Sequence, residues 1–191
     1  NNTELQREAD EAVRVMKAGG IILYPTDTVW GLGCDATNAE AVERIYKLKR
    51  SENKKSMLML CASADMVVRY VNKAPGIAFE VMELATSPLT AILPGAAGVA
   101  ENLIPEERTL GVRIPDHEFC RRILRGLGRP VVSTSANISG EATPAGLAEV
   151  SREIIDGVDF VVNPRFEGKP TKKASSIIAF GEGGEVKIIR E

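Results

Sequence analysis

The 191-residue sequence lacks the short patterns that mark the commonest nucleotide-binding and hydrolytic sites. It contains no GxxxxGK[ST] phosphate loop and no GxGxxG turn after a strand, so neither P-loop nor Rossmann nucleotide binding applies. It also contains no HExxH and no GxSxG, which argues against zinc peptidases and serine hydrolases of the usual types. A catalytic site in this chain must therefore be built from other residues.

Residues that hold metals or disulfides are scarce as well. The three cysteines, Cys34, Cys61 and Cys120, are widely spaced and form no CxxC pair. This pattern argues against a zinc site or a disulfide framework and suits a reducing compartment. The only histidine, His117, follows Asp116 at an expected helix start, and we interpret it as a surface residue. We expect no metal ion held by protein side chains.

Long apolar runs and a strong net charge are also missing. No apolar run approaches the roughly 20 residues of a membrane span, so no membrane association is expected. The polar N-terminal residues predict an amphipathic helix and not a signal peptide, and the expected location is cytoplasmic. The formal net charge of -2 gives no global sign of nucleic-acid binding, so any RNA contact needs a local basic surface.

The residues that are present predict an α/β fold in one domain spanning 1–191. A composition of 44% hydrophobic and 26% charged residues is typical of a soluble globular protein with a substantial core. Apolar periodicity and capping residues predict helices at 5–16, 38–49, from 64, 75–85, from a cap at Asp116, and 143–157. Strands are predicted at 21–24, 57–61, 89–93, 111–114, 130–133, 160–162, 176–180 and 186–189. The close spacing of the last strands favours a mixed sheet.

Two polar segments follow expected strands and carry many hydroxyl groups. Residues 25–33 (PTDTVWGLG) combine threonines and a carboxylate with two glycines that can bring backbone N–H groups close to a ligand; an ordinary turn with a helix cap is the alternative. Residues 133–140 (STSANISG) form a polar cup suited to phosphate or amino-acid oxygens, or else a Ser/Thr-rich turn.

Two further segments are basic. Residues 47–56 (KLKRSENKKS) place five cations between a helix and a strand, which suits either phosphate binding or a solvated helix end. Residues 109–116 (TLGVRIPD) place Arg113 inside an apolar strand, where an arginine is costly unless it pairs with a carboxylate or phosphate. An arginine on an edge strand is the alternative.

PTDTVWGLG and STSANISG, in this order and at this spacing, resemble the YrdC/Sua5 family of L-threonylcarbamoyladenylate synthases. The resemblance extends to KASSIIAF and the closing KIIRE. It implies a single YrdC-like domain of the short form, with a twisted mixed sheet flanked by helices and a concave basic cavity. It further implies a nucleotidyltransferase that makes threonylcarbamoyl-AMP and pyrophosphate from L-threonine, bicarbonate and ATP. The product serves the N6-threonylcarbamoyladenosine modification of tRNA.

The resemblance also implies roles for individual residues, positioning roles for Arg113 and Lys55 among them, with no certain catalytic residue. The residues expected around L-threonine are Thr28, Arg113, Ser133 and Ser175, with Ser176 as the alternative to Ser175. The residues expected around ATP and its Mg²⁺ are Arg50, Lys55, Thr109, Ser135, Asn137, Thr143 and Arg190.

The sequence departs from the family in the basic run and in one later motif. The family pattern K-x-R-P places an arginine where this chain has Ser51, and Arg50 is the only nearby replacement. The family motif W-P-G-P-L-T is reduced to TSPLT at 86–90.

Partners follow from the same resemblance. They are ATP, L-threonine, bicarbonate, downstream tRNA threonylcarbamoyl-transferase proteins and, by direct contact, tRNA itself. A non-catalytic RNA-binding module that uses the basic concave surface is the alternative function, although it has no use for an amino-acid pocket. A carbamoyl-transfer domain of the hydrogenase-maturation type is a second alternative. Such a domain normally lies within a longer chain that has zinc-finger and acylphosphatase parts.

Overall fold

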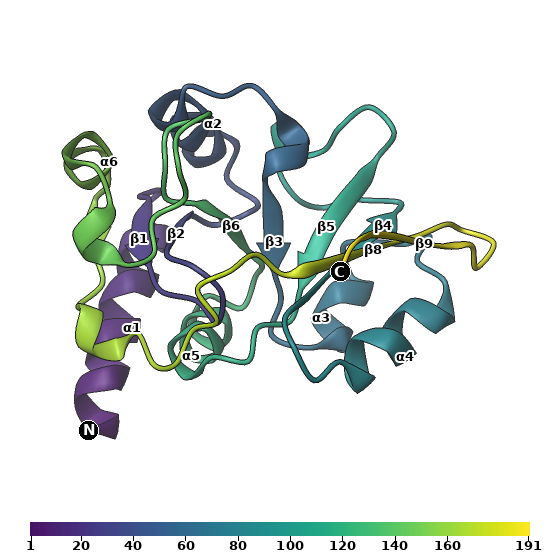
Figure 1. The fold of residues 1–191 in the computed structure, drawn as a ribbon, viewed down its shortest axis with the longest axis horizontal. Coiled ribbons are helices and arrows are strands. Elements are labelled where there is room, and N and C mark those ends of the chain that lie inside the picture. Colours follow the sequence, from purple (N-terminus) through teal and green to yellow (C-terminus); the bar gives the residue numbers. More distant parts are fainter.

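A nine-stranded mixed sheet runs through the computed structural model, which describes residues 1–191 (Figure 1). The strands are β1 (Ile22–Tyr24), β2 (Gly31–Gly33), β3 (Leu58–Leu60), β4 (Leu89–Pro94), β5 (Thr109–Arg113), β6 (Val131–Ser135), β7 (Phe160–Val161), β8 (Ser176–Phe180) and β9 (Val186–Arg190). Their order is β7-β1-β2-β6-β3-β5-β4-β8-β9, with β1/β7, β3/β5 and β4/β8 parallel and the other pairs antiparallel. The predicted α/β class and mixed sheet are confirmed.

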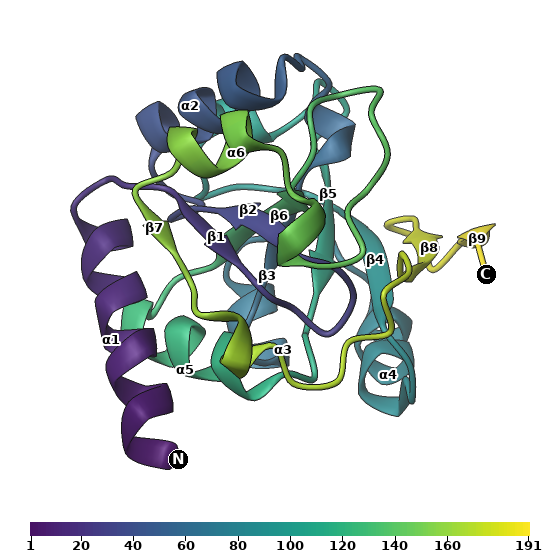
Figure 2. The same cartoon turned by 60° about the vertical axis from the view of Figure 1, so that its left-hand side comes forward.

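Helices cover the sheet in separate groups (Figures 1 and 2). They are α1 (Asn2–Lys17), α2 (Ala39–Lys49), α3 (Ala64–Val68), α4 (Gly76–Leu84), α5 (Glu118–Leu127) and α6 (Arg152–Gly157), with short 3-10 turns at Lys54–Ser56, Glu101–Leu103, Leu147–Glu149 and Pro164–Phe166. Helix α1 packs against α5, α2 packs against α6, and α4 packs on β4. None of the helices is long and apolar enough to cross a membrane.

Local sequence explains the helices that the periodicity predicted. Helix α1 buries Ala9, Ala12 and Met16 along one face, which is the spacing of an amphipathic helix. Helix α2 begins after Asn38, whose side chain accepts a hydrogen bond from the backbone N–H of Ala41. The buried apolar residues of helices and strands join in one contiguous core cluster.

Strand β2 was not predicted, and it lies inside the PTDTVWGLG segment. A Cβ on Gly33 would lie 2.6 Å from Tyr24 Cε1 and 2.8 Å from the Val132 carbonyl oxygen. On Gly31 it would lie 3.1 Å from the Thr134 carbonyl oxygen and 3.6 Å from the Tyr24 ring. The two glycines therefore let the Tyr24 ring cross a buried strand, which is a packing role. The expected approach of their backbone N–H groups to a ligand stays a prediction.

Two predicted helix starts are wrong. Thr143–Pro144 does not open a helix; α6 begins at Arg152, after Ser151, whose Oγ accepts from Ile154 N at 3.4 Å. Helix α5 is capped by His117 and not by Asp116, because His117 Nδ1 accepts from Cys120 N at 3.4 Å. His117 is also buried, so its interpretation as a surface residue is wrong.

Candidate functional site

Arg113 ends β5 and is 2% exposed, at the centre of a group of buried polar side chains. Its Nη1 forms an ion pair with Asp27 Oδ1, and its Nη2 donates to Thr28 Oγ1 at 3.3 Å. Because β5 lies between β3 and β4, Arg113 is not an edge-strand arginine. The carboxylate partner that a buried arginine requires is supplied by the chain itself.

The loop between β1 and β2 is fixed by its own hydroxyl groups. Thr26 Oγ1 accepts from Thr28 N at 3.1 Å, donates to the Val29 carbonyl at 2.8 Å and lies 3.0 Å from Thr28 Oγ1. Asp27 Oδ2 accepts from Asp116 N at 3.1 Å, so the Asp27 carboxylate joins this loop to the segment after β5. Thr28 is 6% exposed and is held facing Arg113.

Two serine hydroxyls, one on β6 and one just before β8, border the same region. Ser133 on β6 lies beside the Tyr24 phenol. Burial raises the pKa of Tyr24 well above its usual range, although the nearby charge of Arg113 acts to lower it. Ser175 Oγ lies 2.7 Å from Thr90 Oγ1 on β4, and both side chains are buried.

The structure distinguishes the two candidate serines, of which Ser175 precedes β8 and Ser176 begins it. Ser176 lines a separate groove with Val81, Leu84 and Ile178 on the outer side of β8. Ser175 contacts Thr90, which lines an inner cavity. Ser175 is therefore the serine on the side of the site.

A cavity of about 220 Å³ lies beside these residues, between the basic run and β3, β5, β4 and β8. Its lining includes the apolar residues Leu58, Ile92 and Ile177 and the polar residues Lys55 and Thr109. Gly111 also lines it, and a Cβ there would lie 3.3 Å from both Leu58 Cβ and Thr90 Cγ2, so glycine keeps this space open. Thr90 belongs to the lining and also contacts Ser175, so the wall of the cavity adjoins the buried serine.

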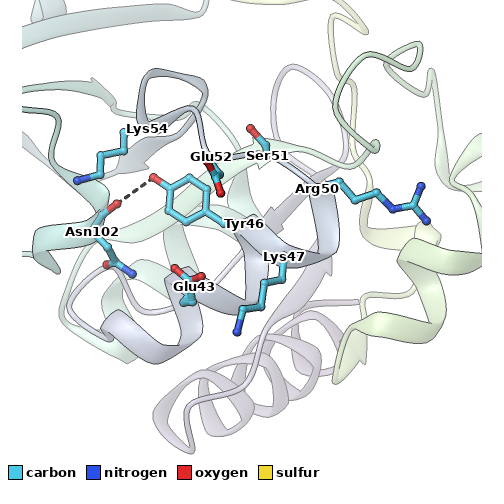
Figure 3. Close-up of a pocket in the computed structure, with 8 residues that line it drawn as sticks. All are labelled: Glu43, Tyr46, Lys47, Arg50, Ser51, Glu52, Lys54 and Asn102. Atoms are coloured by element: carbon cyan, nitrogen blue, oxygen red, sulfur yellow. Dashed lines mark hydrogen bonds between the residues drawn. The ribbon is translucent and has the colours of Figure 1, made fainter.

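The basic run divides between two sides of the molecule. Lys55 is exposed at the cavity, with its Nζ 3.1 Å from Glu107 Oε1. Arg50 is in the left-handed region (φ 53°) at the end of α2, and its Nη2 lies 2.6 Å from Glu153 Oε1 on α6. Figure 3 shows Arg50 extending away from Tyr46 and Lys54. Arg50 therefore does not line the cavity that Lys55 lines, and its expected role as a replacement arginine at ATP stays a prediction.

Figure 3 shows a second hollow, which lies on the other side of the basic run from Lys55. It measures about 720 Å³ and is lined by Glu43, Lys47, Arg50, Ser51 and Glu52, among others. Because it is lined by both carboxylates and cations and by no buried hydroxyl residue, whereas buried Thr90 lines the smaller cavity, we place the candidate site in the smaller cavity instead.

Lys49 is a functional candidate that the sequence analysis missed. It is 3% exposed at the end of α2, and its Nζ donates to the carbonyls of Ser135 at 2.5 Å and Asn137 at 2.8 Å. Burial lowers the pKa of Lys49 to about 8. Its spacing of three, four and seven residues from Tyr46, Ile45 and Val42 places it on the buried face of α2, which is the signal that could have found it.

The STSANISG loop is held by Lys49 and by its own asparagine. Asn137 Nδ2 donates to the Glu141 carbonyl at 2.9 Å and to the Ile138 carbonyl at 3.2 Å, while its Oδ1 is buried without a hydrogen-bond partner. These contacts give Asn137 an ordering role in the loop. Ser135 is half-buried and Thr143 is exposed farther along the loop.

The segment 164–173 and the C-terminal strand complete the site. Thr171 N donates to the Asp27 carbonyl and Lys172 N to the Thr28 carbonyl, each at 2.9 Å, so the 169–173 loop lies against the β1–β2 loop. Trp30 Nε1 donates to Glu167 Oε1 at 3.1 Å. Arg190 Nε on β9 donates to the Ser175 carbonyl at 2.9 Å.

Comparison with known proteins assigns the family. The Sua5/YciO/YrdC family model, described as telomere recombination, matches residues 14–191. The chain belongs to the Sua5/YciO/YrdC family. The resemblance drawn from PTDTVWGLG and STSANISG is therefore confirmed.

Members of the Sua5/YciO/YrdC family resemble this chain over most of its length. Threonylcarbamoyl-AMP synthase from Idiomarina loihiensis is 36% identical over 158 residues, covering 80% of this chain and 85% of the relative. The protein of the same name from Marinobacter nauticus is 33% identical over 178 residues, covering 92% and 93%. The structure of P. abyssi Sua5 complexed with L-threonine matches with a TM-score of 0.83 at 25% identity, covering 92% of this chain. This chain spans about half of that Sua5, at 51%.

Proposed function

We propose that this protein is a threonylcarbamoyl-AMP synthase, a transferase that joins L-threonine, bicarbonate and the AMP part of ATP and releases pyrophosphate and water. Relatives of that name, at 33 and 36% identity over most of both chains, support the proposal. The structural observation that carries it is that Thr90 both lines a cavity with an apolar wall and contacts Ser175, one of the buried hydroxyl residues expected around threonine. An amino acid suits the buried hydroxyl residues and a nucleotide base suits the apolar wall.

The reaction explains why no catalytic triad is needed. The threonine amine combines with bicarbonate or CO2 to give a carbamate, one of whose oxygens then attacks the α-phosphorus of ATP while the bond to pyrophosphate breaks. Because the nucleophile and the leaving group are both anionic, the enzyme must align them and offset their charge. The reaction class is nucleotidyl transfer.

The threonine end of the proposed site is built around Arg113. Its guanidinium has more N–H donors than its contacts with Asp27 and Thr28 use, so a substrate carboxylate can be bound as well. The hydroxyls of Thr28, Ser133 and Ser175 are available to the remaining polar atoms of threonine.

At the nucleotide end, Lys55 exchanges its exposed contact with Glu107 for phosphate, a stronger anion. The residues that we propose for the rest of the nucleotide are Thr109, Ser135, Asn137, Thr143 and Arg190. ATP brings Mg²⁺, which binds mainly to its phosphates. We further propose that the product passes to transferase proteins that modify tRNA, and that this takes place in the cytoplasm. Direct tRNA contact and the basic character of the cavity remain predictions.

The test is the dependence of pyrophosphate release on all three substrates. The protein is incubated with MgATP, bicarbonate and L-threonine, and we expect pyrophosphate together with a threonylcarbamoyl-AMP mass. Omitting threonine or bicarbonate should abolish both signals, because the carbamate is the nucleophile. Equal pyrophosphate release without threonine would instead indicate a simple ATPase. No release under any condition, together with RNA binding, would favour the RNA-binding module.

A further inference from the structure

The Asp27 carboxylate already pairs with Arg113, the residue proposed to bind the carboxylate of threonine. Either Asp27 competes with the substrate and must leave, or it remains and orients the guanidinium. Its contacts decide between these possibilities. Oδ2 accepts from Asp116 N at 3.1 Å, and its backbone carbonyl accepts from Thr171 N at 2.9 Å.

A displaced Asp27 would leave two buried groups without partners. Arg113 is 2% exposed and Asp27 is 8% exposed, so both groups are largely removed from water. Separating a buried ion pair is strongly unfavourable. Asp27 is therefore a fixed part of the site, and a substrate carboxylate uses the N–H groups of Arg113 that Asp27 leaves available.

The ion pair also sets the charge of the site. A buried arginine without a partner would attract any anion, including the phosphates of ATP bound in the adjoining cavity. With Asp27 in place the pair is formally neutral, which reduces the attraction for a multiply charged phosphate more than for a single carboxylate. A neutral pair thereby favours a carboxylate over a phosphate.

We infer that Asp27 is a positioning residue that holds Arg113 for the substrate carboxylate and, by neutralising it, keeps phosphate out of the threonine pocket. This inference rests on the proposed function. It concerns the pocket around Arg113 and not the phosphate contacts of Lys55.

The experiment measures binding of L-threonine and inorganic phosphate by calorimetry to Asp27→Asn, Asp27→Glu and the parent. Asp27→Asn removes the charge while keeping the size of the side chain. We expect its threonine affinity to fall by about ten- to a hundredfold, the effect of disturbing one charged hydrogen-bond pair. We also expect phosphate to compete with threonine in this variant and not in the parent. Asp27→Glu keeps the charge and should keep phosphate out.

A matched control separates this role from general stabilisation. Asp35 is also a buried carboxylate paired with an arginine, Arg129, at 2.7 Å, and it lies outside the site. Asp35→Asn should leave threonine affinity and phosphate exclusion unchanged. If Asp27→Asn does not fold, Asp27→Glu is decisive, and phosphate competition in it would overturn the inference. Parent-like threonine affinity and phosphate exclusion in Asp27→Asn would also overturn it, whereas a parent that binds no threonine would instead remove the proposed function.

Discussion

His117, the only histidine, acts as a neutral hydrogen-bonding bridge at the start of α5. Its Nδ1 accepts from Cys120 N, so the proton lies on Nε2, which donates to the Glu167 carbonyl at 2.7 Å. Burial is the main cause that lowers the pKa of His117. Protonating Nδ1 would remove the acceptor that caps the helix.

This arrangement predicts a loss of stability in mild acid. Because the folded pKa of His117 lies below its unfolded value of 6.5, the unfolded state binds more protons as the pH falls below 6.5. The free energy of unfolding should then decrease, by at most ~1.4 kcal/mol per pH unit. Urea denaturation between about pH 7 and pH 5, above the carboxylate range, measures this slope. His117→Asn, which keeps a capping side chain, should flatten it; an unchanged slope would contradict the assignment.

At the scale of elements, the end of α2 separates two cations that the sequence placed together. Lys55 lies at the cavity, whereas Arg50 is paired with Glu153 on α6. Arg50 adopts φ 53° where the helix ends, with its backbone N–H bonded to the Lys47 carbonyl. The left-handed residue that ends the helix thus turns the arginine side chain away from the site.

We therefore expect Lys55→Ala and Arg50→Ala to differ in ATP binding. Removing Lys55 should weaken MgATP about tenfold, the loss of one exposed charged contact of ~1.4 kcal/mol. Removing Arg50 should change it little. Lys47→Ala removes an equal charge from the outer side of α2 and serves as the control. Calorimetric titration of MgATP into the three variants measures the difference. Equal weakening by Arg50→Ala and Lys55→Ala would show that Arg50 reaches the nucleotide after all.

These elements also show how far the sequence could predict the structure. Helices α1 and α2 followed from periodicity and an asparagine cap, because local spacing decides them. Strand β2 did not, since three residues with two glycines carry little pattern. The helix expected from 143 was wrong because the residues before Ser151 form only a short 3-10 turn at Leu147–Glu149, and Ser151 caps the α-helix.

The candidate site was predictable in its residue types and not in its pairings. A charged residue in an apolar strand pointed to Arg113, yet its partner Asp27 is 86 residues away and only the folded sheet brings the two together. The same holds for Lys49, whose acceptors lie 86 and 88 residues along the chain. The roles of these residues were inferred from the family resemblance, whereas their contacts were known only from the structure.

At the scale of the whole molecule, three thiols are buried in different parts of one core. Cys34 follows β2, Cys61 follows β3 and Cys120 lies in α5. Burial raises the pKa of Cys61 to about 12 and raises the pKa of Cys34 and Cys120 still further. The pKa of Lys49 shifts in the opposite direction, because burial disfavours its charged form and lowers the pKa to about 8.

The thiols predict that stability falls in alkali. Above the unfolded thiol pKa of 9.0 the unfolded state loses protons that the folded state keeps, so the free energy of unfolding decreases as pH rises. Each thiol contributes up to ~1.4 kcal/mol per pH unit. Between pH 8, near the folded pKa of Lys49, and pH 10.5, its unfolded pKa, Lys49 makes the free energy of unfolding rise with pH. This offsets the slope from about one of the three thiols. Urea denaturation with a reducing agent from pH 8 to pH 10 tests this. Cys61→Ala should reduce the slope of the unfolding free energy against pH by the contribution of one thiol. A parent whose stability is constant above pH 9 would refute the prediction.

The fluorescence of Trp30, whose indole donates a hydrogen bond to Glu167, can report on the site. Trp30 is the only tryptophan in the chain, it is 1% exposed, and it lies two residues after Thr28. Its indole is therefore the one strongly emitting group, and it lies where the β1–β2 loop meets the 164–168 segment. Emission at short wavelength reports that segment in place, and a red shift reports water reaching the indole. Fluorescence titration with L-threonine or MgATP can thus follow this corner of the molecule without an added dye.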